Sequence, residues 1–195
     1  MNVRIPARCA LLCATALVVT ACGGAPQETE ANAETEQNVQ VSATFAEGGG
    51  GPAYTYDPEL VPAGATAEVT SNAGDGATTT TLRVTGLVPN RAYGSHAHTQ
   101  ACTPADGADA GPHYQLSEDP VTPSVDPAYA NPQNEIWLDF TTDAEGNGEA
   151  TSTVPWVFPE DRRAAAVVIH EKPTATHAGH AGTAGGRPGC VTVDF

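Results

Sequence analysis

The residues best suited to chemistry in this chain are its six histidines, all of which follow residue 95. His96 and His98 stand two residues apart in GSHAH, and on a strand this spacing places both imidazoles on one face. His113 follows in AGPHY, and His170 ends the apolar segment AAAVVIH. Four imidazoles without a thiolate suit copper, zinc or nickel, and a nitrogen-only set suits Cu(II) best. We therefore expect these four side chains to bind one copper ion.

The other two histidines, His177 and His180, lie in THAGHAG, within a segment rich in Gly, Ala and Thr. A His-x-x-His pair on a loop can bind a metal ion weakly. The alternative is that both side chains are simply exposed to solvent and have no role in metal binding. The sequence leaves both interpretations open.

Short strands joined by turns are the elements expected to position these histidines. The chain contains 20 Gly and 16 Pro, which argues against long helices. AAAVVIHE is a continuous apolar run typical of a central strand, and NAGDG (72–76) and DAEGNG (143–148) predict hairpin turns. Apolar and polar residues alternate in several segments, namely 41–45, 67–69, 82–84, 136–140 and 191–195. The pattern predicts an all-β domain, either a β-sandwich or a Greek-key barrel.

Two long segments lack strand character. The first lies between Cys102 and Glu135 and is rich in Pro, Asp and Ala, and the second covers residues 171–187. Loops of this length within a domain are usually functional or disordered. Because the first segment carries His113, we expect it to be functional.

The first 40 residues have the composition of a targeting segment followed by a tether. MNVRIPAR is positively charged, and the apolar run CALLCATALVVTA is too short to span a bilayer. Val-Thr-Ala before Cys22 resembles a bacterial lipobox, which predicts a signal peptide over 1–21 and a lipid on Cys22; an ordinary signal peptide with an incidental Cys22 is the alternative. Residues 22–40 predict a disordered acidic tether. We expect a domain over 41–195, anchored to a bacterial membrane at the cell envelope and facing outside the cytoplasm.

The chain is strongly acidic, with 23 Asp and Glu against 8 Lys and Arg and a formal net charge of -15. Nucleic-acid binding needs a basic face, so this balance excludes a nucleic-acid-binding protein. It also argues against docking on an anionic membrane through charge.

The cysteines divide by position. Cys9 and Cys13 lie in the predicted signal peptide and Cys22 in the lipobox, so Cys102 and Cys190 remain. An even pair in an export compartment predicts a disulfide, and two buried free thiols are the alternative. Closing so long a loop would contribute about 4–5 kcal/mol.

The order of these motifs, over about residues 39–195, resembles the copper/zinc superoxide dismutases. That family has a G-x-H-x-H strand end, a cysteine a few residues later, a G-P-H or G-G-H motif, a V-V-H-E strand end and a final R-x-x-C. The corresponding segments here are GSHAH, Cys102, GPH (111–113), VIHE (168–171) and RPGC (187–190).

The resemblance implies a flattened Greek-key barrel with the metal held outside it by two long loops. It implies copper binding by His96, His98, His113 and His170, and it also implies the disulfide between Cys102 and Cys190. Arg187 would be the group that attracts the superoxide anion beside the copper, a task that suits a planar and permanently charged guanidinium.

The zinc subsite of the family has no counterpart here. That subsite uses the bridging histidine, two further histidines in the same loop and an aspartate. No histidine lies between Tyr114 and Ile169, and Ile136 falls about where the aspartate is expected. The loop also contains carboxylates without a set to join, namely Asp119, Asp126 and Glu135. The chain thus looks like a copper-only variant in which zinc is not expected.

Without zinc, the second ring nitrogen of His113 carries a proton and needs an acceptor to orient it. The sequence offers Glu171 and Asp139 for this role and does not decide between them. His113 could also deliver protons to peroxide as a general acid.

The resemblance implies copper-dependent dismutation of superoxide to oxygen and hydrogen peroxide at the cell envelope. The alternative is a non-catalytic copper-binding or carrier lipoprotein on the same scaffold. Arg187 distinguishes the two, because a carrier needs no group that guides an anion. Trp137 and Trp156 are expected to serve packing.

Overall fold

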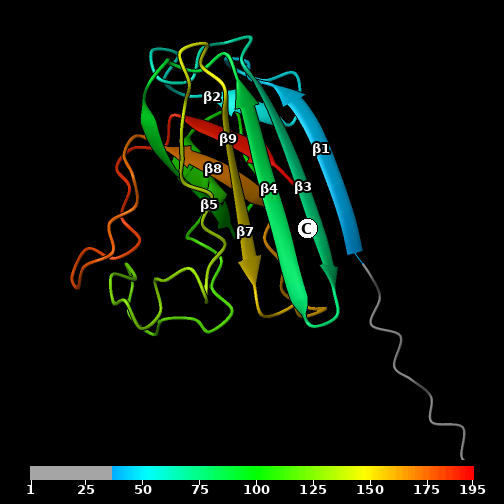
Figure 1. Ribbon diagram of the computed structural model, residues 1–195, viewed down its shortest axis with the longest axis vertical. Helices are drawn as coiled ribbons and strands as arrows, with labels where there is room; N and C mark the ends of the chain where they lie inside the picture. The colour runs from blue at the N-terminus through cyan, green and yellow to red at the C-terminus, as the bar shows by residue number, and fades with distance from the viewer. Residues whose placement is uncertain (1–36) are drawn as a thin grey trace, which may run out of the picture. The chain divides into compact units, whose positions relative to one another are not determined.

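Two antiparallel sheets make up residues 37–195, the part of the chain that the computed structural model describes (Figure 1). The first sheet has the order β1-β3-β4-β7 and consists of β1 (Gln37–Thr44), β3 (Thr66–Gly74), β4 (Ala77–Thr85) and β7 (Gly148–Val154). The second has the order β2-β9-β8-β5-β6 and consists of β2 (Ala53–Thr55), β9 (Gly189–Thr192), β8 (Ala166–His170), β5 (Ala92–His98) and β6 (Phe140–Thr141). The sheets do not close on each other, so the all-β prediction is confirmed as a sandwich rather than a barrel.

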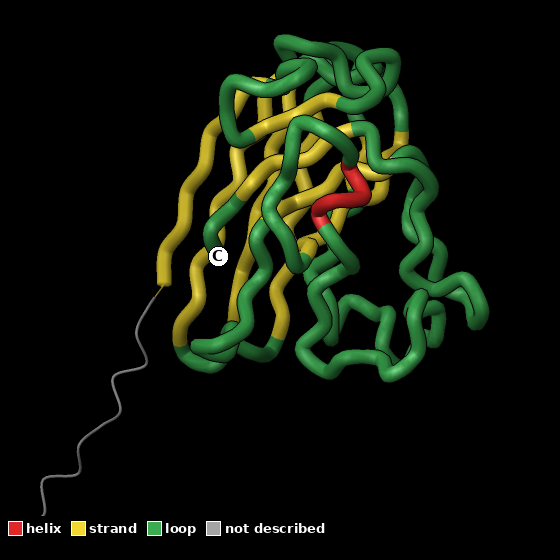
Figure 2. Tube along the Cα trace, turned by 180° about the vertical axis from the view of Figure 1, so that it is seen from behind, coloured by secondary structure: helices red, strands yellow, loops and turns green. Residues whose placement is uncertain are grey.

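Helical structure within residues 37–195 is limited to one 3-10 turn, η1 (Gly107–Ala110), drawn in red in Figure 2. The Asp106 side chain accepts a hydrogen bond from the Ala108 N–H and thereby caps this turn. No helix in this part of the chain is long and apolar enough to cross a membrane. The predicted signal peptide (1–21), the predicted lipidation site Cys22 and most of the predicted tether lie outside the described residues.

The start of β1 corrects one predicted boundary. Gln37–Gln40 were expected to belong to the tether, but they pair with β3 in a register that begins at Gln37 and Ala73. Their side chains alternate between half-buried and exposed, and Val39 packs against the core. The pairing of this strand therefore begins before residue 41.

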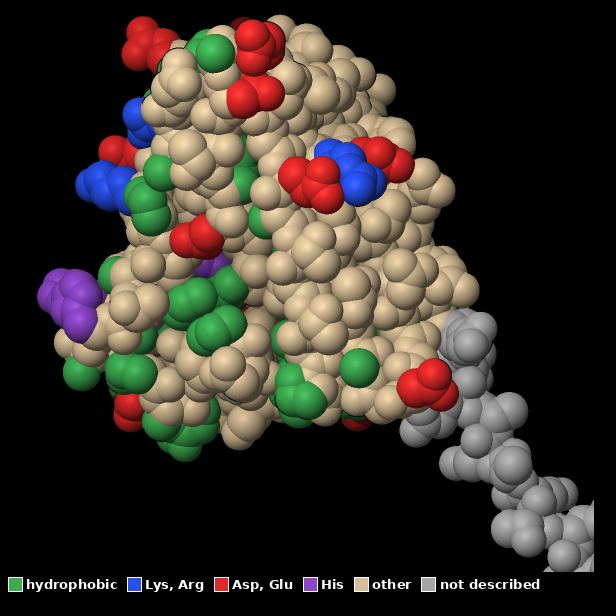
Figure 3. Space-filling view, viewed as in Figure 1, with side chains coloured by type: hydrophobic (Ala, Val, Ile, Leu, Met, Phe, Trp, Pro, Cys, Tyr) green, Lys and Arg blue, Asp and Glu red, His purple; other side chains and the backbone are tan. Residues whose placement is uncertain are grey.

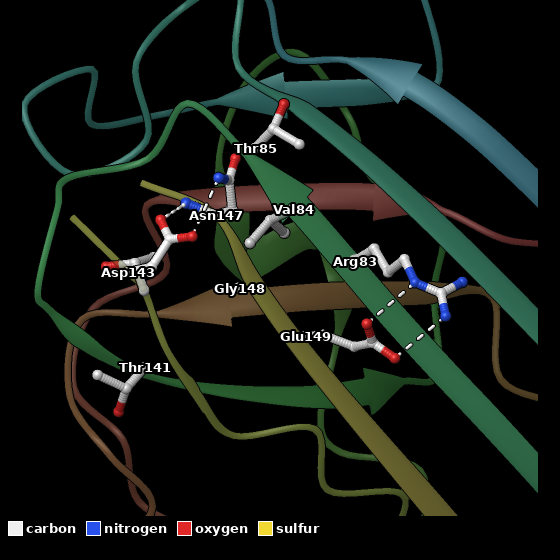
Figure 4. Close-up of a pocket in the computed structure, with 9 residues that line it drawn as sticks. Arg83, Val84, Thr85, Thr141, Asp143, Asn147, Gly148 and Glu149 are labelled. Carbon is white, nitrogen blue, oxygen red and sulfur yellow. Dashed lines mark hydrogen bonds and ion pairs between the residues drawn. The ribbon is translucent and has the colours of Figure 1, made fainter. Parts of the chain in front are cut away.

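The two predicted turns have different outcomes. Asp75 and Gly76 both have positive φ (52° and 75°) and close the β3–β4 hairpin, as this kind of two-residue turn requires. The turn at 143–147 also forms, because Asp143 N–H donates to the Asn147 carbonyl at 2.8 Å. However, the strands beside it, β6 and β7, belong to different sheets, so this turn is a crossover and not a hairpin. Figure 4 shows Asp143 and Asn147 of this turn together with the exposed Arg83–Glu149 ion pair. These residues line a shallow hollow, whose volume is about 440 Å3.

The core lies between the two sheets and contains the side chains expected to face inward. These include Val69, Leu82, Val84, Ile136, Leu138, Phe140, Trp156, Ile169, Val191, Val193 and Phe195. Burial of this apolar surface supplies the main force that holds the two layers together. β8 is the central strand of the second sheet, as its continuous apolar run predicts, and it carries His170 at its end.

The two predicted loops lie next to each other, and the Gly179 N–H donates to the Val125 carbonyl between them at 3.1 Å. The predicted disulfide between Cys102 and Cys190 is present, with a Cα–Cα distance of 5.8 Å. It packs with Ala110 and Val168 in a small second apolar cluster. The disulfide thus ties the start of the first loop to β9.

Candidate metal centre

Two neighbouring strands carry three of the four histidines. His96 and His98 lie on β5, which pairs with β8 so that His170 stands opposite Gly94. A single bridge between His98 and His113 then brings in the first loop. One nitrogen from each of the four imidazoles lies within 4.8 Å of the others. The four predicted histidines are therefore side by side, although His98 and His170 are 72 residues apart in sequence.

Gly94 has to be a glycine for β8 and the second loop to lie so close. A Cβ at this position would meet the Lys172 carbonyl at 2.6 Å and the Ala184 side chain at 2.8 Å. The Gly94 N–H donates to the same Lys172 carbonyl at 2.8 Å. The first residue of the G-x-H-x-H motif thus allows the loop after His170 to cover the histidines.

Hydrogen bonds fix which nitrogen of His98 and of His96 faces the cluster. His98 Nδ1 lies 2.9 Å from the Gly111 carbonyl, which can only accept, so Nδ1 carries the proton and Nε2 is free. His96 Nε2 lies 2.6 Å from Thr174 Oγ1, whose own hydrogen goes to Asp139 Oδ1 at 2.7 Å. His96 Nε2 is therefore the donor, and its Nδ1 is a buried acceptor without a partner among the described residues.

His113 has its proton partner in Glu135. His113 Nδ1 lies 2.8 Å from Glu135 Oε2, and that oxygen also accepts from Trp137 Nε1 at 2.6 Å. Glu135 Oε1 accepts from Gln115 Nε2 at 2.7 Å, and the side chain of Glu135 is only 1% exposed. Donation from Nδ1 leaves His113 Nε2 free to bind a metal ion.

The structure shows that the acceptor for His113 is Glu135, and not Glu171 or Asp139 as the sequence suggested. Asp139 instead accepts hydrogen bonds from Thr174 and from the Ser95 N–H, and so it positions His96. The Glu171 carboxylate accepts from the Gly186 N–H at 3.2 Å and lies 3.8 Å from Lys172 Nζ. Glu135 is therefore not a stray carboxylate, and Trp137 holds it in place in addition to packing.

Burial keeps the strand histidines neutral. Desolvation, reinforced by the neighbouring imidazoles and Arg187, holds the pKa of His96 and of His98 well below its usual range. For His170 the same burial, with smaller contributions from His113 and Arg187, lowers the pKa to about 3. Metal binding requires neutral imidazoles, so these side chains need release no proton near neutral pH.

Arg187 lies beside the cluster and is fixed by the turn before His113. Its Nη1 donates to the Gly111 carbonyl at 2.7 Å and to the Gly107 carbonyl at 3.2 Å. The Gly111 carbonyl also accepts from His98, so one oxygen aligns the guanidinium with a metal-facing imidazole. Burial lowers the pKa of Arg187, and Asp106 opposes this shift. A guanidinium remains charged throughout the physiological range.

A cleft of about 770 Å3 leads to this group between the two long loops. His113, His170 and Arg187 border it, and Arg187 is the only basic side chain among the described residues that do so. Three carboxylates, Glu118, Asp119 and Glu135, also line the cleft. The cleft therefore gives a small anion a route to the histidines, with its one positive charge next to them.

The residues present fit a copper ion. His98 Nε2 and His170 Nε2 face each other at 3.3 Å, an arrangement that a cation between them would satisfy. The unpartnered Nδ1 of His96 and the free Nε2 of His113 complete a set of four nitrogens. A set of imidazoles alone matches copper better than it matches a hard cation.

Among the solved structures similar to this chain is a Cu/Zn superoxide dismutase from Brucella abortus. The match has a TM-score of 0.53 at 16% sequence identity and covers 80% of this chain and 99% of that chain. The chain has the superoxide dismutase fold. A double and a single mutant of a SOD-like protein from Bacillus subtilis also match, at 19% identity with TM-scores of 0.49 and 0.48, covering 65% and 66% of this chain and 87% and 88% of those chains.

No family model matches the sequence. No curated protein matches it either. At these identities the superoxide dismutase fold is what the comparison shows, and the activity has to be argued from the site.

Proposed function

We propose that this protein removes superoxide with a single copper ion bound by His96, His98, His113 and His170, and that it does so without zinc. The observation that carries the proposal is the convergence of four imidazole nitrogens beside a guanidinium at the base of an open cleft. Copper supplies the redox chemistry when bound, because it can take an electron from one superoxide and give it to the next.

The side chains around the copper site have separate tasks in this proposal. Arg187 binds the superoxide anion at the base of the cleft and offsets the repulsion from a chain of net charge -15. His113 Nε2, at the stage when it does not hold the copper ion, is the nitrogen that would take up a proton and deliver it to the product. The Glu135 carboxylate on the opposite nitrogen balances the positive charge that His113 gains in that step.

Glu135 supports the part of the proposal that excludes zinc. In a zinc-containing site the second nitrogen of the bridging histidine would bind the metal, whereas here His113 Nδ1 donates to a buried carboxylate at 2.8 Å. Gln115 and Trp137 also donate to Glu135. In the proposed site this hydrogen-bond network takes the place of the second metal.

We also propose that a lipid on Cys22 anchors the domain to a bacterial membrane at the cell envelope. The lipobox-like Val-Thr-Ala-Cys and the acidic segment behind it support this. Metabolic labelling with a radioactive fatty acid should mark the wild-type protein and not Cys22→Ser. A wild-type protein that is released unlabelled, with its N-terminus beyond Cys22, would contradict the anchor.

The deciding experiment measures superoxide removal by the purified full chain after copper loading, together with its copper and zinc content. We expect about one copper per chain, zinc well below one, and activity that follows the copper content. Activity no greater than that of free copper buffered to the same level would refute the catalytic proposal and favour a copper carrier. One equivalent of tightly bound zinc would refute its copper-only part.

A further inference from the structure

His177 and His180 form a second histidine pair, outside the four-histidine group. Their ring centroids are 4.9 Å apart and the ring planes are tilted by 42°. Two pairs within the four-histidine group, His96–His170 and His98–His113, have a separation of 4.8 Å. The exposed pair is therefore as close as imidazoles that converge on a common point.

The pair lies on a turn that its own hydrogen bonds close. The His180 N–H donates to the His177 carbonyl at 3.1 Å, and both the N–H and the hydroxyl of Thr183 donate to the His180 carbonyl, at 3.0 and 2.7 Å. At the base of the turn the Ala175 N–H donates to the Thr183 carbonyl at 2.9 Å. Because the backbone is already ordered, bringing the two imidazoles onto one ion costs little additional entropy.

The turn also lies at the edge of the cleft that reaches the buried histidines. Gly182 and Thr183 line that cleft, and a Cβ on Gly182 would lie 3.8 Å from two atoms of the His113 ring. Gly182 follows His180 by two residues, a span of at most about 7 Å, so the Cα of His180 lies within about 12 Å of the His113 ring. Figure 3 shows histidine surface standing out from the loops, and a smaller area of histidine surface between them.

We propose that His177 and His180 are a surface site that captures copper and passes it through the cleft to the four buried histidines. Two imidazoles bind Cu(II) more strongly than other divalent first-row ions, but two donors bind far more weakly than four. Because the exposed site is weak and the buried site is strong, copper moves from the exposed pair to the four buried histidines. The capture step does not depend on superoxide chemistry, and the transfer step rests on the proposed function only in requiring copper at the four histidines.

The first test counts copper sites. Metal-free full-length protein is titrated with Cu(II) sulfate, and bound copper is followed by equilibrium dialysis and electron paramagnetic resonance. The wild type should bind a second, weaker equivalent with a signal distinct from the first, and the double variant His177→Ala/His180→Ala should bind only the first. Thr176→Ala, in the same loop, is the matched control and should bind both. Equal stoichiometry in the wild type and the double variant would overturn the proposal.

The second test measures loading. Metal-free protein is mixed with limiting copper in a glycine buffer, and the signal of the four-histidine site is followed with time. A capture site raises the local copper concentration, so the double variant should load more slowly by about tenfold. Loading at the wild-type rate would overturn the transfer step.

Fully loaded double variant should remove superoxide as fast as the fully loaded wild type, because neither histidine borders the cleft. If the copper-loaded wild type has no activity, the proposed dismutation is refuted. The number of copper ions bound still tests the surface site. The two proposals therefore fail independently.

Discussion

Replacing Glu135 by Gln tests whether the carboxylate behind His113 supports copper binding. Glu135 Oε2 accepts hydrogen bonds from His113 and Trp137, which the amide oxygen of a glutamine can still accept. The bond to His113 loses its charge, and charged hydrogen bonds are about twice as strong as neutral ones. Loss of a partner of this kind behind a ligating histidine lowers metal affinity about 10- to 100-fold. We expect a loss near the lower end, about tenfold, since the geometry survives.

The Glu135→Gln substitution also affects stability, through the second carboxylate oxygen, Oε1. Glu135 Oε1 accepts from Gln115 Nε2 at 2.7 Å, so the new amide nitrogen would face another donor. Gln115 cannot turn its amide freely, because its oxygen accepts from the Asp119 N–H at 2.9 Å and its nitrogen donates to Ser124. A buried donor without an acceptor costs about 1–3 kcal/mol, which should appear in urea unfolding of the metal-free and loaded protein alike.

Copper affinity is measured by competition with a chelator of known affinity, and unfolding is measured on the same preparations. Glu149→Gln is the matched control, because Glu149 forms the exposed ion pair with Arg83 at 3.1 Å. We expect this control to change neither quantity beyond about 0.5 kcal/mol. If Glu135→Gln binds copper as tightly as the wild type, then the bond to Glu135 does not support His113 as argued.

Three further predictions follow from the site. Arg187→Ala should lower superoxide removal about tenfold at unchanged copper content, and Arg187→Lys should retain part of the rate, in assays at low salt; equal rates would remove Arg187 from the mechanism. Removing the disulfide with Cys190→Ser should lower the free energy of unfolding by about 2–5 kcal/mol, measured in urea, and an unchanged midpoint would contradict its stabilising role. His170 has a pKa of about 3 in the fold. The unfolded chain binds a proton at His170 below about pH 6.5 and the folded chain does not, so this side chain alone should cost the metal-free protein up to about 1.4 kcal/mol per pH unit below that value. Burial lowers the pKa of His96 and of His98 in the same direction, so the total slope should exceed this figure. Urea midpoints that do not change between pH 7.5 and 5 would refute this.

The sequence predicts the layers and the histidine group well, because both depend on local patterns. Alternation along the strands determines which side chains face the core, and the two-residue spacing of His96 and His98 determines that both face one way. His113 and His170 are predicted as ligands from their places on a loop and at a strand end, and the order of the motifs supports the same assignment. The structure brings His113 and His170 to the same point through two long-range pairings, the His98–His113 bridge and the β5–β8 ladder.

The partners of the histidines could not be predicted in the same way. Glu135 is the first residue of an apolar-polar alternation, and this pattern does not mark it as a buried partner of His113, which lies 22 residues earlier in the sequence. Asp139 and Thr174 meet only because the second loop returns across β5. One feature of the sequence could have indicated a role for Glu135 in the site. Glu135 immediately precedes Ile136, the position where the zinc-binding aspartate of the family is expected.

The turn at 143–147 shows a different limit. Its Asp, Gly and Asn residues correctly predict a tight reversal, and Asp143 Oδ1 accepts from the Asn147 N–H at 2.7 Å. Turn chemistry does not reveal whether the strands on either side pair with each other or separate into two layers. That choice is made by the pairing of β7 with β4, which are distant in sequence. Arg83 of β4 and Glu149 of β7, which face each other in this pairing, are 66 residues apart.

The wide sequence separation of the metal-facing residues has a consequence for when copper can be acquired. Before β5 and β8 pair, His96 and His98 are the only two of the four metal-facing histidines that are neighbours, because His98 and His170 are separated by 72 residues. Contacts over such distances form late in folding, since closing a long loop costs entropy before any contact repays it. A chain that crosses a membrane unfolded would therefore arrive without copper at this site, and the ion would be acquired only where folding is completed.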